Sequence, residues 1–213
     1  MTTKQIILSA LILNATTNSA SAMEAEQQKK LDQETLAAAD RGNFKEVIEL
    51  VKAGANPNFN QGTKNTLLQH AVKAKSLEGV EELIKIGADD ENGEALFSAA
   101  TYSYPENTYH NIASHLIRHG KSNINAQPYH YHHCDLLCNG NTAAHMAAAH
   151  CDTEMLALLY QYKTNFTIKN DAQEIPLDNA RSAHSYITSL NHLHLLPSCA
   201  ASIAILEAIE KEQ

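Results

Sequence analysis

Glycine is scarce in this 213-residue sequence, and its positions exclude a common class of ligand site. Only eight glycines occur, and all except Gly79 fall where the sequence predicts turns. A phosphate-binding loop needs several glycines close together, because its backbone must approach the phosphate oxygens. The serine-nucleophile, zinc-protease and C-x-x-C motifs are missing as well. We therefore predict no nucleotide site and no catalytic residues, and we expect that the protein is not an enzyme.

Basic residues and long apolar runs are also few. Lys and Arg total 16 against 24 Asp and Glu, which gives a formal net charge of −8. Nucleic-acid binding needs clustered Lys and Arg to meet the phosphates, and no such cluster occurs, so we expect no nucleic-acid partner and favour a basic one. Hydrophobic residues make up 44 % and charged residues 19 %, which argues against a disordered chain.

The first 22 residues contain the three parts of a secretory signal peptide in order. Lys4 supplies the positive start, residues 6–13 form a mainly apolar run, and a polar tail ends in Ala-Ser-Ala at 20–22. A run of eight residues is too short to cross a bilayer, and a frayed N-terminal cap helix is the alternative interpretation. We expect cleavage before Met23, no membrane insertion afterwards, and export of the protein to a periplasm or to the outside.

The rest of the chain repeats itself every 33 residues. Gly54, Gly87 and Gly120 have this spacing, and Ala38 and Ala71 share it. Two independent sets of residues at one period indicate a repeat architecture.

The clearest unit is residues 139–170, NGNTAAHMAAAHCDTEMLALLYQYKTNFTIKN. A tight turn at Asn139-Gly140 precedes Thr142 as an N-cap, a helix at about 143–149 and a second helix at about 153–162. The unit resembles one ankyrin repeat, with His145 at the histidine of the family's T-P-L-H-x-A motif. In that family this histidine hydrogen-bonds between repeats, and Cys151 takes the position of the glycine between the helices.

The resemblance covers residues 34–183 well and 184–213 more loosely. It predicts an all-α ankyrin-repeat solenoid of about five helix-turn-helix repeats with hairpin loops.

Gly120 closes the third repeat in this register, and Lys163 stands where the fourth would have its closing glycine. After Ala180 we expect an irregular segment up to Pro197 and then a cap helix at 198–212. The predicted units are a signal peptide at 1–22, a lead-in cap at 23–33, and a domain at 34–213 with repeats at 34–58, 65–90, 93–125, 139–170 and 171–213.

The resemblance implies that the protein binds another protein through its concave face and hairpin loops. Insertions in repeat proteins map to loops that often bind partners, and tyrosines occur in or beside two of them, at 102–107 and 129–138. Those tyrosines, Tyr109 included, serve either recognition or packing of the insertions. By position, the candidate contact residues are Asn60, Gln61, Lys64, Glu91, Asn92, Tyr102, Tyr104, Tyr129, Tyr131 and His132.

The second insertion is also rich in histidine and cysteine. Imidazole and thiolate are ligands of zinc and copper, and C-x3-C with nearby histidines resembles the copper-binding loop of Sco-type proteins. The candidate metal ligands are His130, His132, His133, Cys134 and Cys138, with His145, His150 and Cys151 following on the next helices. If the chain is exported, Cys134 and Cys138 instead form a disulfide or stay simple thiols, and the four cysteines allow three pairings. Zinc or copper at 130–138 stays open as the one possible cofactor.

Three functions are therefore compatible with the sequence. The first is an exported, monomeric protein-interaction module. The others are a periplasmic metal-binding or redox-support protein that uses residues 129–138, and a secreted factor that acts on a host cell.

Overall fold

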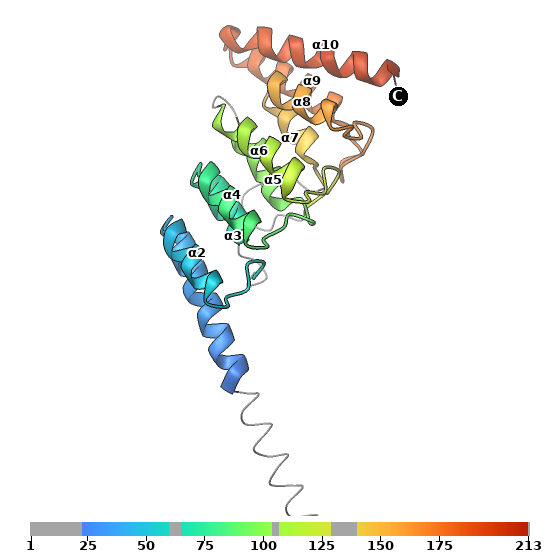
Figure 1. The fold of residues 1–213 in the computed structure, drawn as a ribbon. Coiled ribbons are helices and arrows are strands. Elements are labelled where there is room, and N and C mark those ends of the chain that lie inside the picture. Colours follow the sequence, from blue (N-terminus) through green and yellow to red (C-terminus); the bar gives the residue numbers. More distant parts are fainter. Residues whose placement is uncertain (1–22, 60–64, 104–106, 129–139, 213) are drawn as a thin grey trace, which may run out of the picture.

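The computed structural model describes residues 23–59, 65–103, 107–128 and 140–212, and over these ranges it is a stack of paired helices without strands (Figure 1). Residues 23–40 are helical, and this helix lies beside the next one, Phe44–Lys52 (Figure 1). In chain order the elements are α2 Phe44–Lys52, α3 Leu67–Lys73, α4 Leu77–Lys85, α5 Glu94–Tyr102, α6 Thr108–His119, α7 Ala143–Ala149, α8 Thr153–Gln161, α9 Pro176–Ser189, η1 Leu193–Leu195 and α10 Leu196–Glu212. The predicted all-α repeat solenoid is confirmed.

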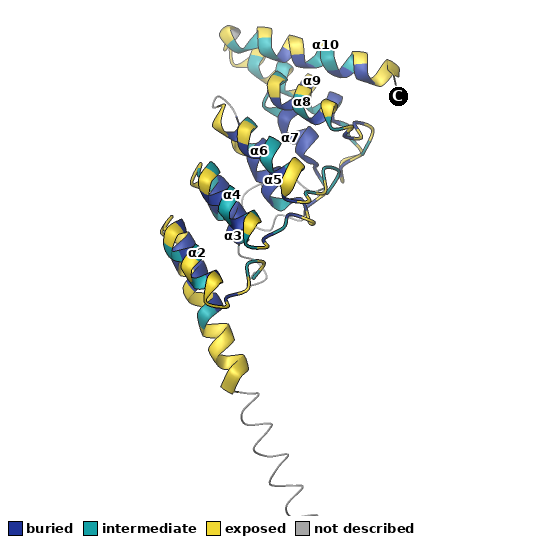
Figure 2. Ribbon diagram, in the orientation of Figure 1, coloured by how far each residue is buried: buried dark blue, intermediate teal, exposed yellow. Residues whose placement is uncertain are grey.

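The helices form two layers. One layer is the series α3, α5, α7 and α9, and the other is α2, α4, α6, α8 and α10, with each helix contacting the next in its layer. Buried residues face the inside of the stack and exposed residues its outside, while the first turns of the helix at 23–40 are exposed (Figure 2). Each repeat therefore buries its apolar face against its neighbours, as in other solenoids.

The fourth repeat has the core that the sequence predicts. Ala147 and Ala148 in α7 are fully buried, as are Met155, Leu156 and Leu159 in α8. Alanine allows α7 to approach α5, α8 and α9 closely, and the larger side chains of α8 fill the space beside it. The helix at about 143–149 is observed at those residues, and α8 ends one residue before the predicted 162.

Side chains at the turns between repeats link one turn to the next. The Asn58 Oδ1 atom accepts a hydrogen bond from the Asp89 backbone N–H at 3.0 Å, and its Nδ2 donates to the Gly87 carbonyl at 3.3 Å. Further along, Asn125 Oδ1 accepts from the Asn165 N–H at 2.9 Å. These bonds satisfy backbone groups that no helix uses and set the spacing of successive turns.

Gln127 hydrogen-bonds across the long connection between α6 and α7. Its Nε2 donates to the Gly140 carbonyl at 2.5 Å and to the Lys169 carbonyl at 2.8 Å. Across this connection α5 contacts α7 and α6 contacts α8. The stack is therefore continuous, although residues 129–139 lie outside the described residues.

The turn that closes the third repeat differs from the prediction. Gly120 is the C-cap of α6 with φ −88°, and the left-handed conformation falls on Lys121, with φ 54°. The cause is that α6 has twelve residues where α4 and α8 have nine. In the fourth repeat Lys163 does adopt the left-handed conformation, with φ 60°, as its position predicts.

The C-terminal region is more helical than predicted. Instead of an irregular segment after Ala180, α9 continues to Ser189. The last helix, α10, begins at Leu196 rather than at Ser198. Pro197 therefore lies in the first turn of α10, where its missing N–H costs no helical hydrogen bond.

Candidate functional site

The structure describes three of the residues proposed to contact a partner. Glu91 and Asn92 are exposed in the turn before α5, and Tyr102 is 39 % exposed as the last residue of that helix. A nine-residue helix is about 13 Å long. Glu91 and Asn92 therefore lie at one end of α5 and Tyr102 at the other. The other candidates, Asn60, Gln61, Lys64, Tyr104, Tyr129, Tyr131 and His132, lie outside the described residues.

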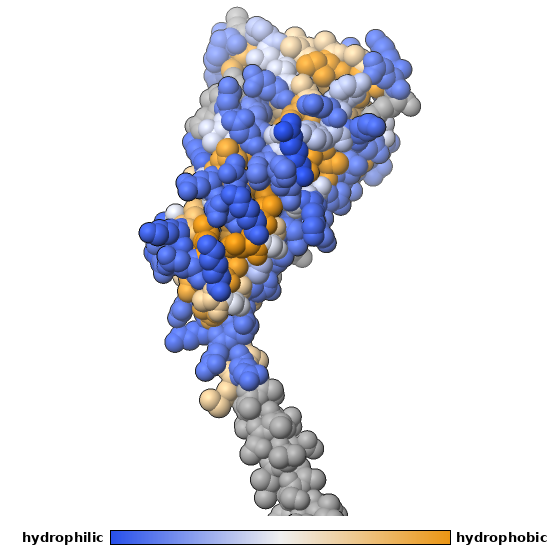
Figure 3. All heavy atoms as spheres, in the orientation of Figure 1, coloured by the Kyte–Doolittle hydropathy of each residue, from blue (hydrophilic) through white to orange (hydrophobic). Residues whose placement is uncertain are grey.

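The tyrosines of the third repeat have different environments. Tyr102 belongs to α5, not to an insertion, and its ring centroid lies 6.1 Å from that of Tyr109. Tyr109 is only 4 % exposed and belongs to the core, so its packing interpretation is the correct one. The large exposed apolar side chains among the described residues are Met23, Tyr102, Tyr160, Tyr186 and Leu190. Tyr186 and Leu190 both stand at the end of α9, and the other three lie on different helices. Figure 3 shows hydrophobic residues interspersed with hydrophilic ones on one face of the stack.

The predicted metal ligands His130, His132, His133, Cys134 and Cys138 lie outside the described residues. Within the described part of the chain, no group of three or more His, Cys, Asp or Glu side chains is arranged to hold a metal ion. The residues expected to follow these ligands have other roles. His150 Nδ1 lies 3.4 Å from the Ala100 carbonyl oxygen, and Cys151 is bonded to another cysteine.

His145 connects the fourth repeat to the fifth. Its Nδ1 accepts the Thr142 backbone N–H at 3.1 Å, and its Nε2 therefore carries the proton that it donates to the Glu174 carbonyl at 3.0 Å. The residue is fully buried, and this burial lowers the pKa of its imidazole. Both ring nitrogens are engaged in the neutral form, which confirms the structural role expected for this histidine.

Asp90 has the corresponding role at the start of α5, where no threonine caps the helix. It is 1 % exposed, and its carboxylate accepts the N–H groups of Ala95 at 2.8 Å and Leu96 at 3.0 Å. The hydroxyl of Ser122 donates to the same carboxylate at 2.7 Å and so joins the turn after α6 to α5. Burial raises the pKa of Asp90 to about 6, although these hydrogen bonds act in the opposite direction.

A polar cavity of about 190 Å³ lies between the third and fourth repeats and the start of α10. It is lined by Ser103, Asn107, His110, Cys151, Asp152, Thr153, Glu154 and Ser198. Sequence reasoning missed this group, because its members come from three segments and no spacing motif connects them.

Asp152 lines that cavity, is 5 % exposed and makes several of the polar contacts there. It caps α8 by accepting the Met155 N–H at 2.9 Å, and it also accepts the Ser103 hydroxyl at 2.5 Å. His110 Nε2 lies 2.9 Å from the same carboxylate, and its Nδ1 lies 3.4 Å from Glu154. The serine therefore donates to the carboxylate and not to the imidazole, so the group lacks the Ser–His contact that activates a nucleophilic serine.

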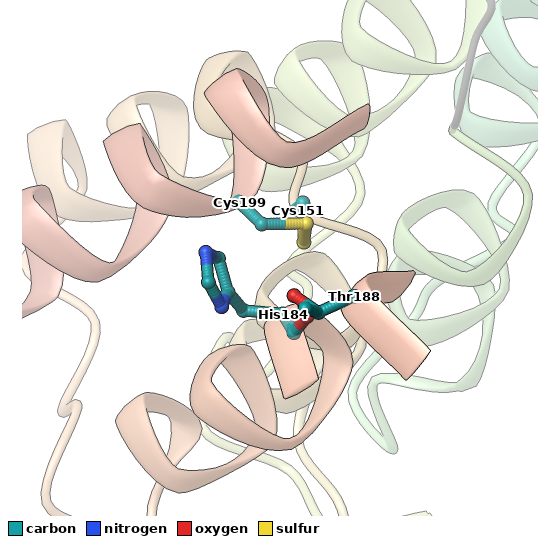
Figure 4. The surroundings of a disulfide bond; sticks show 4 residues. All are labelled: Cys151, His184, Thr188 and Cys199. Atoms are coloured by element: carbon teal, nitrogen blue, oxygen red, sulfur yellow. A yellow bond between two sulfur atoms is a disulfide. The ribbon is translucent and has the colours of Figure 1, made fainter. Parts of the chain in front are cut away.

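A disulfide lies beside the cavity and joins Cys151 to Cys199, with 4.6 Å between the two Cα atoms. Cys151 has φ 57°, so it occupies the left-handed position of the turn between α7 and α8, as Gly42 does in the first repeat with φ 71°. That position matches the prediction for Cys151, but the pairing with Cys199 did not follow from the sequence. His184 and Thr188 of α9 lie next to the bond (Figure 4).

Comparison with known proteins gives two results. A family model described as "Ankyrin repeats (3 copies)" matches residues 35–128, and one described as "Ankyrin repeat" matches residues 139–171. Alpha-latrotoxin-Lg1a of Latrodectus geometricus is 27 % identical over 133 residues, which are 62 % of this chain. The chain spans only 9 % of the length of that relative. In the described part of the chain, every helix is too short or too polar to cross a membrane.

Proposed function

Because this chain belongs to the ankyrin-repeat family, whose repeats are protein–protein interaction modules, we propose that it binds a protein partner through its concave face and hairpin turns. The observation that carries the proposal is the row of hydrogen-bonded turns between repeats. Asn58 is bonded to the turn at Asp89, and Asn125 to the turn at Asn165. These bonds fix the turns before a partner arrives, so little ordering entropy is lost on binding.

The charge of the chain supports a basic partner. The formal net charge is −8, and Glu91, exposed at a turn, adds a carboxylate to the proposed face. Except for Tyr186 and Leu190 at the end of α9, the large exposed apolar side chains lie on separate helices, which favours a polar contact over one continuous apolar interface.

We also propose that the protein works outside the cytoplasm, in a periplasm or after secretion. The support is the signal-like sequence at 1–22 together with the disulfide between Cys151 and Cys199. Disulfides persist in oxidising compartments and are rare in the cytosol.

Site-specific photo-crosslinking tests which face binds. A photoreactive amino acid replaces Asn92 in the turn before α5, and a control replaces Glu49, which is exposed on the outer helix α2. We expect a protein adduct, identified by mass spectrometry, from position 92 and none from position 49. An adduct from position 49 alone would place the interface on the outer helices and reject the proposed face.

A further inference from the structure

The disulfide ties the last helix of the described chain to an earlier repeat. Cys151 lies in the turn between α7 and α8, and Cys199 lies in the first turn of α10, 48 residues later. The intervening helix α9 packs against both α7 and α10. The bond therefore closes the C-terminal end of the stack covalently around α9.

Apart from this bond, α10 is held mainly by its packing on α9, and it has fewer contacts with α7 and α8 of the fourth repeat. Its buried side chains are Cys199, Ser202, Leu206 and Ile209, of which only the last two are large and apolar, and Ile203 and Ile205 are partly buried against the core. The Oγ atom of Ser202 and the Oδ1 atom of Asn179 in α9 are buried without a hydrogen-bond partner in the described structure. Buried polar atoms without partners oppose the docking of α10 on the stack.

The polar contacts at the edge of α10 add little. Tyr160 donates to Glu212 at 2.6 Å, and Arg181 donates to Glu207 at 2.9 Å. Both contacts are exposed, so water and salt screen them. The covalent bond is therefore the strongest single link between α10 and the fourth repeat.

A small reagent has a path to this bond. Cys151 and Ser198 line the polar cavity beside it, although the cysteines themselves are 4 % and 0 % exposed. Thr188, which lies next to the bond in Figure 4, is exposed. A small thiol that enters the cavity from solvent therefore reaches the Cys151 side of the bond first.

We propose that the Cys151–Cys199 disulfide is a redox-operated lock on α10: a dithiol reductant opens it, and α10 then leaves the faces of α8 and α9 that it covers. One thiolate of the reductant attacks a sulfur of the bond and releases the other cysteine as a thiolate, which takes up a proton. The second thiol of the reductant displaces the first cysteine from the mixed disulfide. Two electrons and two protons reach the protein, and the reductant leaves as its own disulfide. This inference goes beyond partner binding and does not depend on it.

Hydrogen exchange of the full chain tests the lock. The protein carries Cys134→Ser and Cys138→Ser, so that alkylation with iodoacetamide counts only the thiols of this pair. Exchange measured by mass spectrometry is compared before and after reduction by dithiothreitol. We expect the protection of the amides of α10 to fall on the order of a thousandfold. The cause is the conformational entropy that the chain between Cys151 and Cys199, 48 residues apart, gains when the bond opens. The amides of α3 to α6 keep their protection.

Two results would overturn the proposal. In one, α10 stays fully protected although both thiols are alkylated, which would mean that non-covalent packing holds it. In the other, protection falls equally from α3 to α10, which would mean that the bond supports the whole fold. A variant with Cys151→Ser and Cys199→Ser should show the same protection of α10 as the reduced chain. If that variant does not fold, the comparison of the oxidised with the reduced chain tests the proposal.

Discussion

Asp90→Asn should change how the stability of this protein depends on pH. The carboxyl group is 1 % exposed, and its burial raises its pKa from 3.8 to about 6 in the folded state. In the unfolded chain the pKa returns to its ordinary value. Well below pH 3.8 both states hold the proton, and the folded protein has the full stability that this group contributes.

As the pH rises from about 4 to about 6, the unfolded state loses the proton first, so the free energy of unfolding decreases. The shift corresponds to about 3 kcal/mol at 1.36 kcal/mol per pKa unit, and the loss is complete at about pH 7, where both states have lost the proton. Asparagine has nearly the same shape and does not titrate. The free energy of unfolding of the natural chain minus that of the variant should therefore fall by about 2–3 kcal/mol between pH 4 and pH 7.5.

Urea denaturation followed by circular dichroism at a series of pH values measures this difference. Glu49→Gln removes an exposed carboxylate and controls for the change in net charge. A difference that stays constant from pH 4 to pH 7.5 would show that burial does not raise the pKa. A difference that increases with pH would show that the hydrogen bonds from Ala95 and Leu96 outweigh burial.

Three further predictions concern the fourth repeat and its disulfide. Ala148→Leu should lower the free energy of unfolding by about 1–3 kcal/mol, because a larger side chain overpacks the core at this buried position. Ala149→Leu, at a partly exposed position, should lower it much less. Equal melting temperatures of the two variants would contradict the close packing of α7 at Ala148. Cys199→Ala should lower the free energy of opening of α10 by about 4 kcal/mol, and Cys151→Gly by about 1 kcal/mol less, since glycine relieves the left-handed turn; hydrogen exchange of α10 in both variants checks the order. Glu154→Gln removes a negative charge from the cavity, so a thiolate should reduce the disulfide about 2–5-fold faster at low salt and at an unchanged rate at high salt. Stopped-flow kinetics measures the reduction rate. A rate that the substitution does not affect at low salt would show that the charge does not matter.

The sequence predicted the fold well where one residue type determines a local structure. Thr142, His145 and the alanines of α7 have fixed places in a repeat, so the helices of the fourth repeat were predicted within one residue. The family's spacing also placed Lys163 in a left-handed turn. Such features depend on contacts between residues that are close in sequence or one period apart.

Features that depend on distant contacts were not predictable in this way. Ser103, His110 and Asp152 meet only because the third repeat stacks on the fourth, and Cys199 reaches Cys151 only because α9 is long enough to bring α10 back. The helical continuation of α9 was missed because its His, Ser and Tyr residues have weak helix propensity, and packing against α7 and α10 decides its conformation. The proposed contact and metal-binding residues at 129–138 remain predictions.

The bonds of Gln127 to Gly140 and Lys169 make the connection at 128–139 a natural place for sequence exchange. The α5–α7 and α6–α8 contacts join the repeats on either side of the connection directly, and each doubling of the length of a flexible closed loop costs only about 0.6 kcal/mol of entropy. Evolution or a protein engineer can therefore exchange this segment for another peptide and leave the repeats on either side in register. The solenoid then serves as a constant frame that displays a variable sequence.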